Sequence, residues 1–239
     1  MRRRLSAAAL CLVMSGCTAQ QVAAPPTVDE VLFTGTLQEL APHHSGDHFV
    51  YRATGVDGGD RLQVEHLSAL DTAGEFLVNM SEDGIAIGGT HVRDDGAAVS
   101  VVSEAAPQQD AMLVYAEPLP SFVVPLPSRL PRATSSVTLL RVSDGTVLAR
   151  GRAEQTMTAR RVSPDASGAT FELHTERSVV LPNQVMHLSA TTWIAPGIGE
   201  VRSEGRTNGG PLLRRTLLCA VIGGQRVGDC AALTNAAKE

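Results

Sequence analysis

The chain has 239 residues, and its 20 Lys and Arg against 25 Asp and Glu give a formal net charge of −5. This acidic balance argues against nucleic acid as a partner and against binding to anionic lipid by charge alone. Aromatic residues make up 3% of the chain. Few side chains can therefore stack on sugars or bases, and the core must be built from aliphatic residues.

The N-terminus has the layout of an export signal. Three arginines at positions 2–4 precede an apolar run that ends at Met14. A helix that crosses a bilayer needs about twenty apolar residues, and this run has about half that number. We therefore predict that residues 1–16 are a signal peptide. Its removal leaves 223 residues with 17 basic and 25 acidic side chains, a formal net charge of −8, which suits one domain.

The apolar run leads into a cysteine. Val13-Met14-Ser15-Gly16-Cys17 resembles the lipobox of bacterial lipoproteins, in which small residues precede a cysteine that is diacylated and becomes the new N-terminus. Met14 replaces the leucine that is usual in that motif. The resemblance implies that Cys17 carries acyl chains, in which each buried CH₂ contributes about 0.8 kcal/mol to membrane binding. The alternative is an ordinary signal cleaved after Ala19 or Ala24, which would release the protein.

The residue after the cysteine is Thr18 and not Asp. By resemblance to enterobacterial lipoproteins, this implies the outer membrane, with the protein domain in the periplasm and the acyl chains as the contact with the membrane. Residues 17–26 are rich in Ala, Gln and Pro and predict a flexible tether. The Thr27-Val28-Asp29-Glu30 stretch matches a capping box and predicts a short helix through Phe33.

Beyond the tether, the apolar side chains recur with a period of two. The clearest runs are residues 49–53, 62–66 and 171–174. In the second run, the alternation assigns Gln63 and Glu65 to a solvated face. Asp-Gly and Asn-Gly turn signals lie between the runs, as in hairpins. The pattern predicts a mainly β domain over residues 27–239, with few short helices. It is either a single antiparallel curved sheet, a half-barrel, or a β-sandwich.

Two segments stand apart from this pattern. Residues 146–162 lack an internal breaker and form either one long bent strand or two strands joined at Gly151. Residues 117–131 carry five of the thirteen prolines, which excludes a central strand. This apolar segment is either a crossover packed over one end of the sheet or a lid over an apolar cavity. The ligand-lining residues that the second interpretation predicts are Phe122, Val124, Leu126 and Trp193.

Two of the four cysteines remain for a disulfide. Cys11 leaves with the signal and Cys17 carries lipid, which leaves Cys219 and Cys230 in an oxidising compartment. The intervening residues contain a Gly-Gly turn between two short apolar runs, so a bond would pin a C-terminal hairpin and contribute about 3 kcal/mol. A redox pair would need the closer CxxC spacing.

Residues 193–201, Trp-Ile-Ala-Pro-Gly-Ile-Gly-Glu-Val, resemble a W-x-A-P-G-x-G-x-V signature near the end of many uncharacterised bacterial envelope lipoproteins. The resemblance covers the last third of the chain. It implies the open half-barrel sheets of the lipoprotein carrier and receptor class, with a concave apolar face, and it transfers no activity. Physically, Trp193 is a large core anchor, and Gly197 and Gly199 allow a turn or bulge.

The best candidate for catalytic chemistry is a histidine-rich loop. His43, His44, Asp47 and His48 lie within six residues and offer ligands for zinc or copper. No HExxH spacing supports such a site, and no G-x-S-x-G predicts a serine nucleophile. A polar loop without metal is the favoured interpretation, and no cofactor is expected.

The sequence therefore predicts a non-enzymatic, lipid-anchored protein of the bacterial cell envelope. Its role is to bind an apolar or lipidic ligand or to support an envelope assembly through protein contacts, with no nucleic acid as partner. The alternative is a metal-dependent periplasmic hydrolase that uses the histidine loop. A third possibility is a purely structural lipoprotein, which would bind neither lipid nor metal.

Overall fold

The computed structural model describes residues 30–54 and 58–231. The predicted signal peptide, Cys17, the tether of residues 17–26 and Thr27 lie outside these residues. Within them, no helix combines the length and the hydropathy that a membrane span requires.

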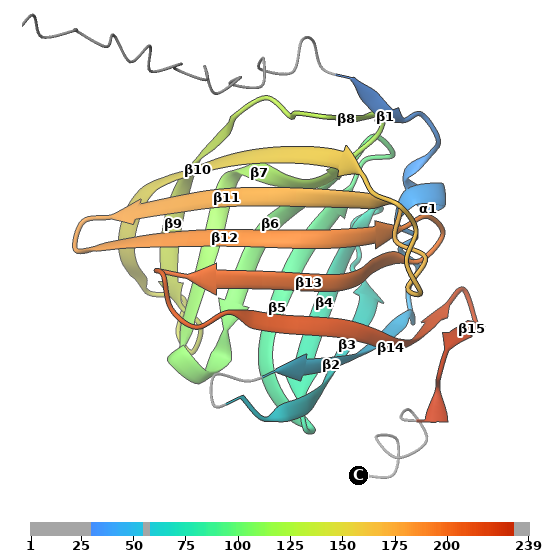
Figure 1. Ribbon diagram of the computed structural model, residues 1–239. Coiled ribbons are helices and arrows are strands. Elements are labelled where there is room, and N and C mark those ends of the chain that lie inside the picture. The colour runs from blue at the N-terminus through green and yellow to red at the C-terminus, as the bar shows by residue number, and fades with distance from the viewer. Residues whose placement is uncertain (1–29, 55–57, 232–239) are drawn as a thin grey trace, which may run out of the picture.

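Twelve antiparallel strands form one sheet that closes on itself as a barrel (Figure 1). They are β2 (His48–Thr54), β3 (Asp60–Ala69), β4 (Glu75–Glu82), β5 (Ile85–Asp94), β6 (Ala98–Ala106), β7 (Ala111–Val123), β9 (Ala133–Arg141), β10 (Val147–Arg161), β11 (Phe171–Leu181), β12 (Gln184–Ala195), β13 (Gly199–Thr207) and β14 (Leu213–Ile222). The barrel closes because β14 pairs with β2 on one side and with β13 on the other. The predicted mainly β fold with a single curved antiparallel sheet is confirmed, and the sheet curls further than a half-barrel.

Short elements surround one end of the barrel. β1 (Val31–Phe33) pairs with β8 (Leu126–Pro127), and α1 (Leu37–Leu40) lies beside them, at the right of Figure 1. A single turn of 3₁₀ helix, η1 (Pro107–Gln109), joins β6 to β7, and β15 (Gln225–Gly228) pairs with β14 outside the ring.

The end of the barrel beside α1 is filled by a hydrophobic cluster. Its buried members are Leu32, Leu40, Leu126, Leu130, Met157, Ala159, Phe171, Leu173 and Ile194. The cluster joins β1, α1 and the proline-rich segment to inward-facing residues of β10, β11 and β12. Burying aliphatic and aromatic side chains here removes the apolar surface of these short elements from water.

The helix prediction at Thr27 is wrong in position. Residues Val31–Phe33 form a strand, because pairing with β8 buries Leu32 between the strand and the barrel end. The helix begins at Leu37, after a second T-x-x-E pattern that starts at Thr36, nine residues beyond Thr27. There, the Glu39 amide donates to the Thr36 hydroxyl and the Thr36 amide donates to the Glu39 carboxylate, which completes a capping box.

The prediction that residues 117–131 form no central strand is confirmed, although the residues up to Val123 belong to the barrel strand β7 and pair on one side. β7 runs through Pro118 and Pro120 and pairs with β6 as far as Val123. The prolines are tolerated because the pairing of β7 with β9 ends at Tyr115, so this half of β7 has a ladder on one side only. Residues 128–130 then take the place of β9 beside β10, where the Leu130 amide donates to the Met157 carbonyl oxygen.

β10 is one strand of fifteen residues, so the first of the two alternatives for residues 146–162 holds. Gly151 lies inside it, where the neighbouring strand β11 approaches closely. A Cβ at this position would collide with the carbonyl oxygen of Val180. Glycine is therefore needed for close backbone approach and not for a chain break.

Gly151→Ala is expected to lower the free energy of unfolding by about 2 kcal/mol, because the backbone of β11 must shift to admit the methyl group. Gly205→Ala in β13 is the matched control, since a Cβ there would lie at ordinary distances of 3.5 Å from Ala190 Cβ and the Ser189 carbonyl oxygen. Urea denaturation of both variants measures the difference. Equal stability of the two would contradict the assigned role of Gly151.

The predicted disulfide is confirmed. Cys219 in β14 is bonded to Cys230, with their Cα atoms 4.9 Å apart. The last residues of β14, the short strand β15 and the Gly223–Gly224 turn between them form the expected hairpin. The bond fastens this hairpin beside the barrel, and Cys219 itself is fully buried.

Candidate ligand-binding site

The barrel is hollow, and two cavities lie along its inner wall. The first has a volume of about 220 Å³ and is lined mainly by apolar side chains of β2 to β7. The apolar lining includes Phe49, Leu67, Val78, Val92, Val101 and Phe122. The inward-facing Val78, Met80 and Thr90 are only partly buried, as expected for side chains that face an open interior and not a packed core.

The second cavity has a volume of about 330 Å³ and lies against β12, β13 and β14. Its lining is more polar and includes Gln63, Thr192, Ser203 and Thr207. Both cavities are lined by Glu200 and Arg215, so these two residues stand where the cavities meet.

Arg215 is the centre of a buried polar cluster. Its Nε donates to Glu200 Oε1 at 2.6 Å and to Ser203 Oγ at 3.1 Å, and its Nη1 forms an ion pair with Glu65. The guanidinium carbon also lies 4.5 Å from the centre of the Tyr51 ring. Strands β2, β3, β13 and β14 therefore each contribute one or more side chains, and the cluster spans the seam where the barrel closes.

Burial controls the ionisation of this cluster. It raises the pKa of Glu65, an effect that Arg215 opposes and that the charge of Glu200 adds to. Burial likewise raises the pKa of Tyr51 well above its ordinary value, so its hydroxyl is neutral at pH 7. Burial lowers the pKa of His43, which lines the same cavity at the end of the barrel.

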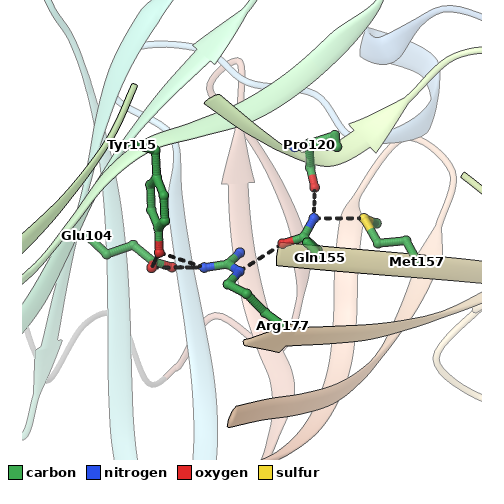
Figure 2. Close-up of polar contacts among 6 residues, drawn as sticks. All are labelled: Glu104, Tyr115, Pro120, Gln155, Met157 and Arg177. Atoms are coloured by element: carbon green, nitrogen blue, oxygen red, sulfur yellow. Dashed lines mark hydrogen bonds and ion pairs between the residues drawn. The ribbon is translucent and has the colours of Figure 1, made fainter. Parts of the chain in front are cut away.

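A second polar network joins β6 and β7 to β10 and β11 across the barrel interior (Figure 2). Arg177 of β11 donates from Nη1 to both oxygens of Glu104 in β6, at 2.8 and 2.9 Å, and from Nε to Gln155 Oε1 at 2.8 Å. Gln155 Nε2 donates in turn to the carbonyl oxygen of Pro120 at 2.6 Å. Burial raises the pKa of Tyr115, and its hydroxyl donates to Glu104 at 2.7 Å.

This network supports the wall of the barrel where the ladder between β7 and β9 is missing. Each donor of Gln155 and each oxygen of Glu104 has a partner, which is what a buried polar group needs to avoid a desolvation penalty. We therefore assign it a structural role, unlike the cluster at Arg215, which faces the cavities.

The side chains of the histidine-rich loop do not converge on one point. Asp47 is buried, and its carboxylate accepts hydrogen bonds from the His44 amide at 2.9 Å and from the Gly223 amide at 2.8 Å. His43 Nδ1 and His48 Nδ1 hydrogen-bond instead with backbone carbonyl oxygens, each at 2.6 Å. Among residues 30–54 and 58–231, no three His, Cys, Asp or Glu side chains gather so that they could hold a metal ion. Asp47 thus fastens its loop to the β14–β15 hairpin.

Three of the four predicted ligand-lining residues, Phe122, Val124 and Leu126, lie at the hydrophobic cluster of the barrel end, and Trp193 packs against a different cluster. Phe122 lines the first cavity, whereas Leu126 is fully buried in the cluster at the barrel end, and Val124 packs against that cluster. Trp193 follows the cavity-lining Thr192 and therefore faces the opposite side of β12. The Arg202 guanidinium covers its ring, at 3.7 Å from the ring centre.

The assignment of Gln63 and Glu65 to a solvated outer face is wrong. Both residues are buried and face the barrel interior, together with Leu67. The side chains of this strand do alternate between two faces, but a hollow barrel can hold polar side chains on its inner face. The sequence signal for a polar inner face is that Glu65 and Leu67 are two residues apart and therefore lie on the same face of the strand.

The comparisons with known proteins gave structural likenesses only. No family model and no curated protein matches the chain. A crystal structure from Bacteroides fragilis, described as a "putative exported protein with YmcC-like fold", is similar over 79% of this chain and 98% of its own, at 14% identity and a TM-score of 0.44. A "putative lipoprotein" from Parabacteroides distasonis is similar over 78% of this chain and 97% of its own, at 10% identity and a TM-score of 0.43.

Proposed function

We propose that this chain is a lipid-anchored protein of the bacterial cell envelope whose barrel binds a small ligand with an apolar body and which performs no catalysis. The anchor is Cys17, as the lipobox-like Val13–Cys17 stretch implies, and the membrane is the outer one, with the barrel in the periplasm. The observation that supports ligand binding best is the hollow interior, with a cavity of about 220 Å³ lined mainly by apolar side chains.

Two further features support a binding role. The disulfide between Cys219 and Cys230 suits an oxidising compartment such as the periplasm. Arg177, Arg215 and their carboxylate partners form a small number of polar groups on the inner wall, and ligand sites typically orient an apolar ligand by a few polar contacts.

The anchor is tested by producing the full chain in a bacterial host and measuring the intact mass of the membrane-extracted protein. The expected result is a diacylated cysteine at position 17 and cofractionation with the outer membrane. Cys17→Ser is expected to lose both the acyl mass and the membrane fraction. An unmodified wild-type protein in the soluble periplasmic fraction would contradict the proposal.

The ligand is sought in the same preparation, by mass spectrometry of small molecules released on denaturation. Val78→Trp fills the first cavity, and Asn79→Trp on the same strand faces outward and is the matched control. A ligand of this cavity is expected to be retained by wild type and Asn79→Trp and lost from Val78→Trp. Equal recovery from all three, or no bound molecule in any, would contradict binding in the barrel.

A further inference from the structure

The cluster at Arg215 differs in composition from the two other ion pairs that the described residues form at the barrel interior. Arg177 is paired with Glu104, and Arg61 is paired with Glu82 at 2.6 Å. Arg215, in contrast, is shared between two carboxylates from different strands, Glu65 and Glu200.

The other titratable side chains that line the first cavity do not supply a second positive charge for the two carboxylates. They are His43 from the loop before β2 and Tyr51 from β2. Burial lowers the pKa of the imidazole and raises that of the phenol, so both are neutral at pH 7. At the second cavity, Glu204 and Arg214 neutralise each other at 3.2 Å. One negative charge therefore remains in the interior when both carboxylates of the cluster are ionised.

Glu65 and Glu200 each have one carboxylate oxygen that is open to a further hydrogen bond. Glu65 and Glu200 each use Oε1 for Arg215. Among the described residues, no hydrogen bond reaches Oε2 of either side chain, and neither atom belongs to the buried polar atoms that lack a partner. Both residues line the first cavity, so these oxygens are available to a donor that enters it.

We propose that the first cavity binds a monocationic amphiphile, whose ammonium group contacts Glu65 and Glu200 and whose apolar body lies along Phe49, Val78 and Phe122. The inference rests on the proposed function and names its ligand class. An ammonium group has up to three donors and no acceptor, which fits two free carboxylate oxygens. It also cancels the uncompensated charge in a place where water cannot screen it.

An anionic amphiphile is disfavoured by the same geometry. A fatty-acid carboxylate would enter beside two carboxylates, and the guanidinium that would have to receive it already bonds to both. Like charges in a desolvated site repel strongly. A neutral alcohol would gain the apolar contacts and one hydrogen bond from its hydroxyl to a carboxylate oxygen, but it would leave the negative charge uncompensated.

The test compares hexylamine, hexanol and hexanoate as probes by isothermal titration of the full-length protein in mild detergent. We expect hexylamine to bind about tenfold tighter than hexanol, which corresponds to about 1.4 kcal/mol, and hexanoate to bind more weakly than either. Glu65→Gln and Glu200→Gln should each abolish the preference for the amine and leave hexanol binding in place. Glu172→Gln, which removes a carboxylate paired with Arg160 on the outer face, should change nothing.

The outcomes separate the two proposals. Equal binding of amine and alcohol, or tighter binding of hexanoate, would overturn the cationic ligand class while leaving an apolar binding site intact. An amine preference that survives both glutamine variants would overturn the assigned residues. Failure of all three probes to bind wild type, with Val78→Trp behaving identically, would overturn both the ligand class and the binding function.

Discussion

Replacing Arg177 by methionine is expected to lower the free energy of unfolding by about 2 kcal/mol, because the buried guanidinium makes several hydrogen bonds and the Glu104 carboxylate, which is 36% exposed, loses its cation. Methionine keeps the length and the apolar stem of the side chain but donates no hydrogen bond. Glu104 then loses two charge-assisted hydrogen bonds and Gln155 loses its acceptor contact. Urea denaturation, followed by circular dichroism, measures the loss.

The matched control is Arg160→Met. Arg160 also forms a two-point ion pair, with Glu172, but its side chain is 69% exposed against 9% for Arg177. An exposed pair contributes less than about 1 kcal/mol, so this variant should unfold almost like wild type. Similar losses in the two variants would show that burial of the Arg177 network does not stabilise the barrel.

A second substitution separates two effects of losing Arg177: the loss of its contact with Glu104, and the cost of leaving the Glu104 charge without a cation. In the Arg177→Met background, Glu104→Gln removes the negative charge and keeps an oxygen that can accept from Tyr115. Part of the lost stability should return, because the uncompensated carboxylate is gone. A further decrease would mean that Glu104 does not depend on Arg177 for its charge compensation.

Local patterns were sufficient to predict most of the strands and the disulfide. Alternation and Gly-containing turns act over a few residues, and so does the link between Cys219 and Cys230. Closure of the barrel could not be predicted in the same way. It depends on the pairing of β14 with β2 and β13, which brings Arg214 opposite Thr54 from the other end of the chain. Alternation alone does not distinguish a strand in an open sheet from one in a closed barrel.

The candidate site was missed for a related reason. A period of two reveals that a strand has two different faces, but it does not reveal which face is inside. At Phe49 and Tyr51 the apolar face is the inner one, as expected, whereas at Gln63 and Glu65 the polar face is inside. The proline-rich segment was recognised as unusual, yet only Phe122 of its predicted ligand-lining residues reaches a cavity. The other two fill the end of the barrel because short elements there need a core of their own.

Arg215→Met is expected to destabilise the protein by about 4 kcal/mol at pH 7, and by clearly less at pH 5. Without Arg215, Glu65 keeps a raised pKa from burial and from Glu200 and loses the cation that opposed it. At pH 7 the variant must either bury a carboxylate without a partner or bind a proton against the bulk pH, and both cost free energy. At pH 5 the proton is available and the penalty shrinks.

The direction of this change in stability with pH follows from proton linkage. The pKa of Glu65 in the folded barrel lies above its ordinary value of 4.5, so the native state holds more protons than the unfolded chain between that value and the raised one. Stability conferred by this group is therefore complete below pH 4.5 and falls as pH rises through the raised pKa. Removing Arg215 raises the pKa of Glu65 in the folded protein, so the decrease in stability extends to higher pH. Each further unit of pKa adds about 1.4 kcal/mol to the total decrease.

Arg214→Met is the matched control, because Arg214 is the preceding residue of β14 and pairs with Glu204 while its side chain is 59% exposed. It should cost less than about 1 kcal/mol at every pH. Fluorescence of the single tryptophan, Trp193, during urea denaturation at pH 5, 6, 7 and 8 measures all three proteins. In the Arg215→Met background, Glu65→Gln should remove most of the pH dependence, because the group that binds the proton is gone. A loss in Arg215→Met that is equal at all four pH values would mean that Glu65 does not titrate inside the barrel, and that the interior carries its negative charge elsewhere.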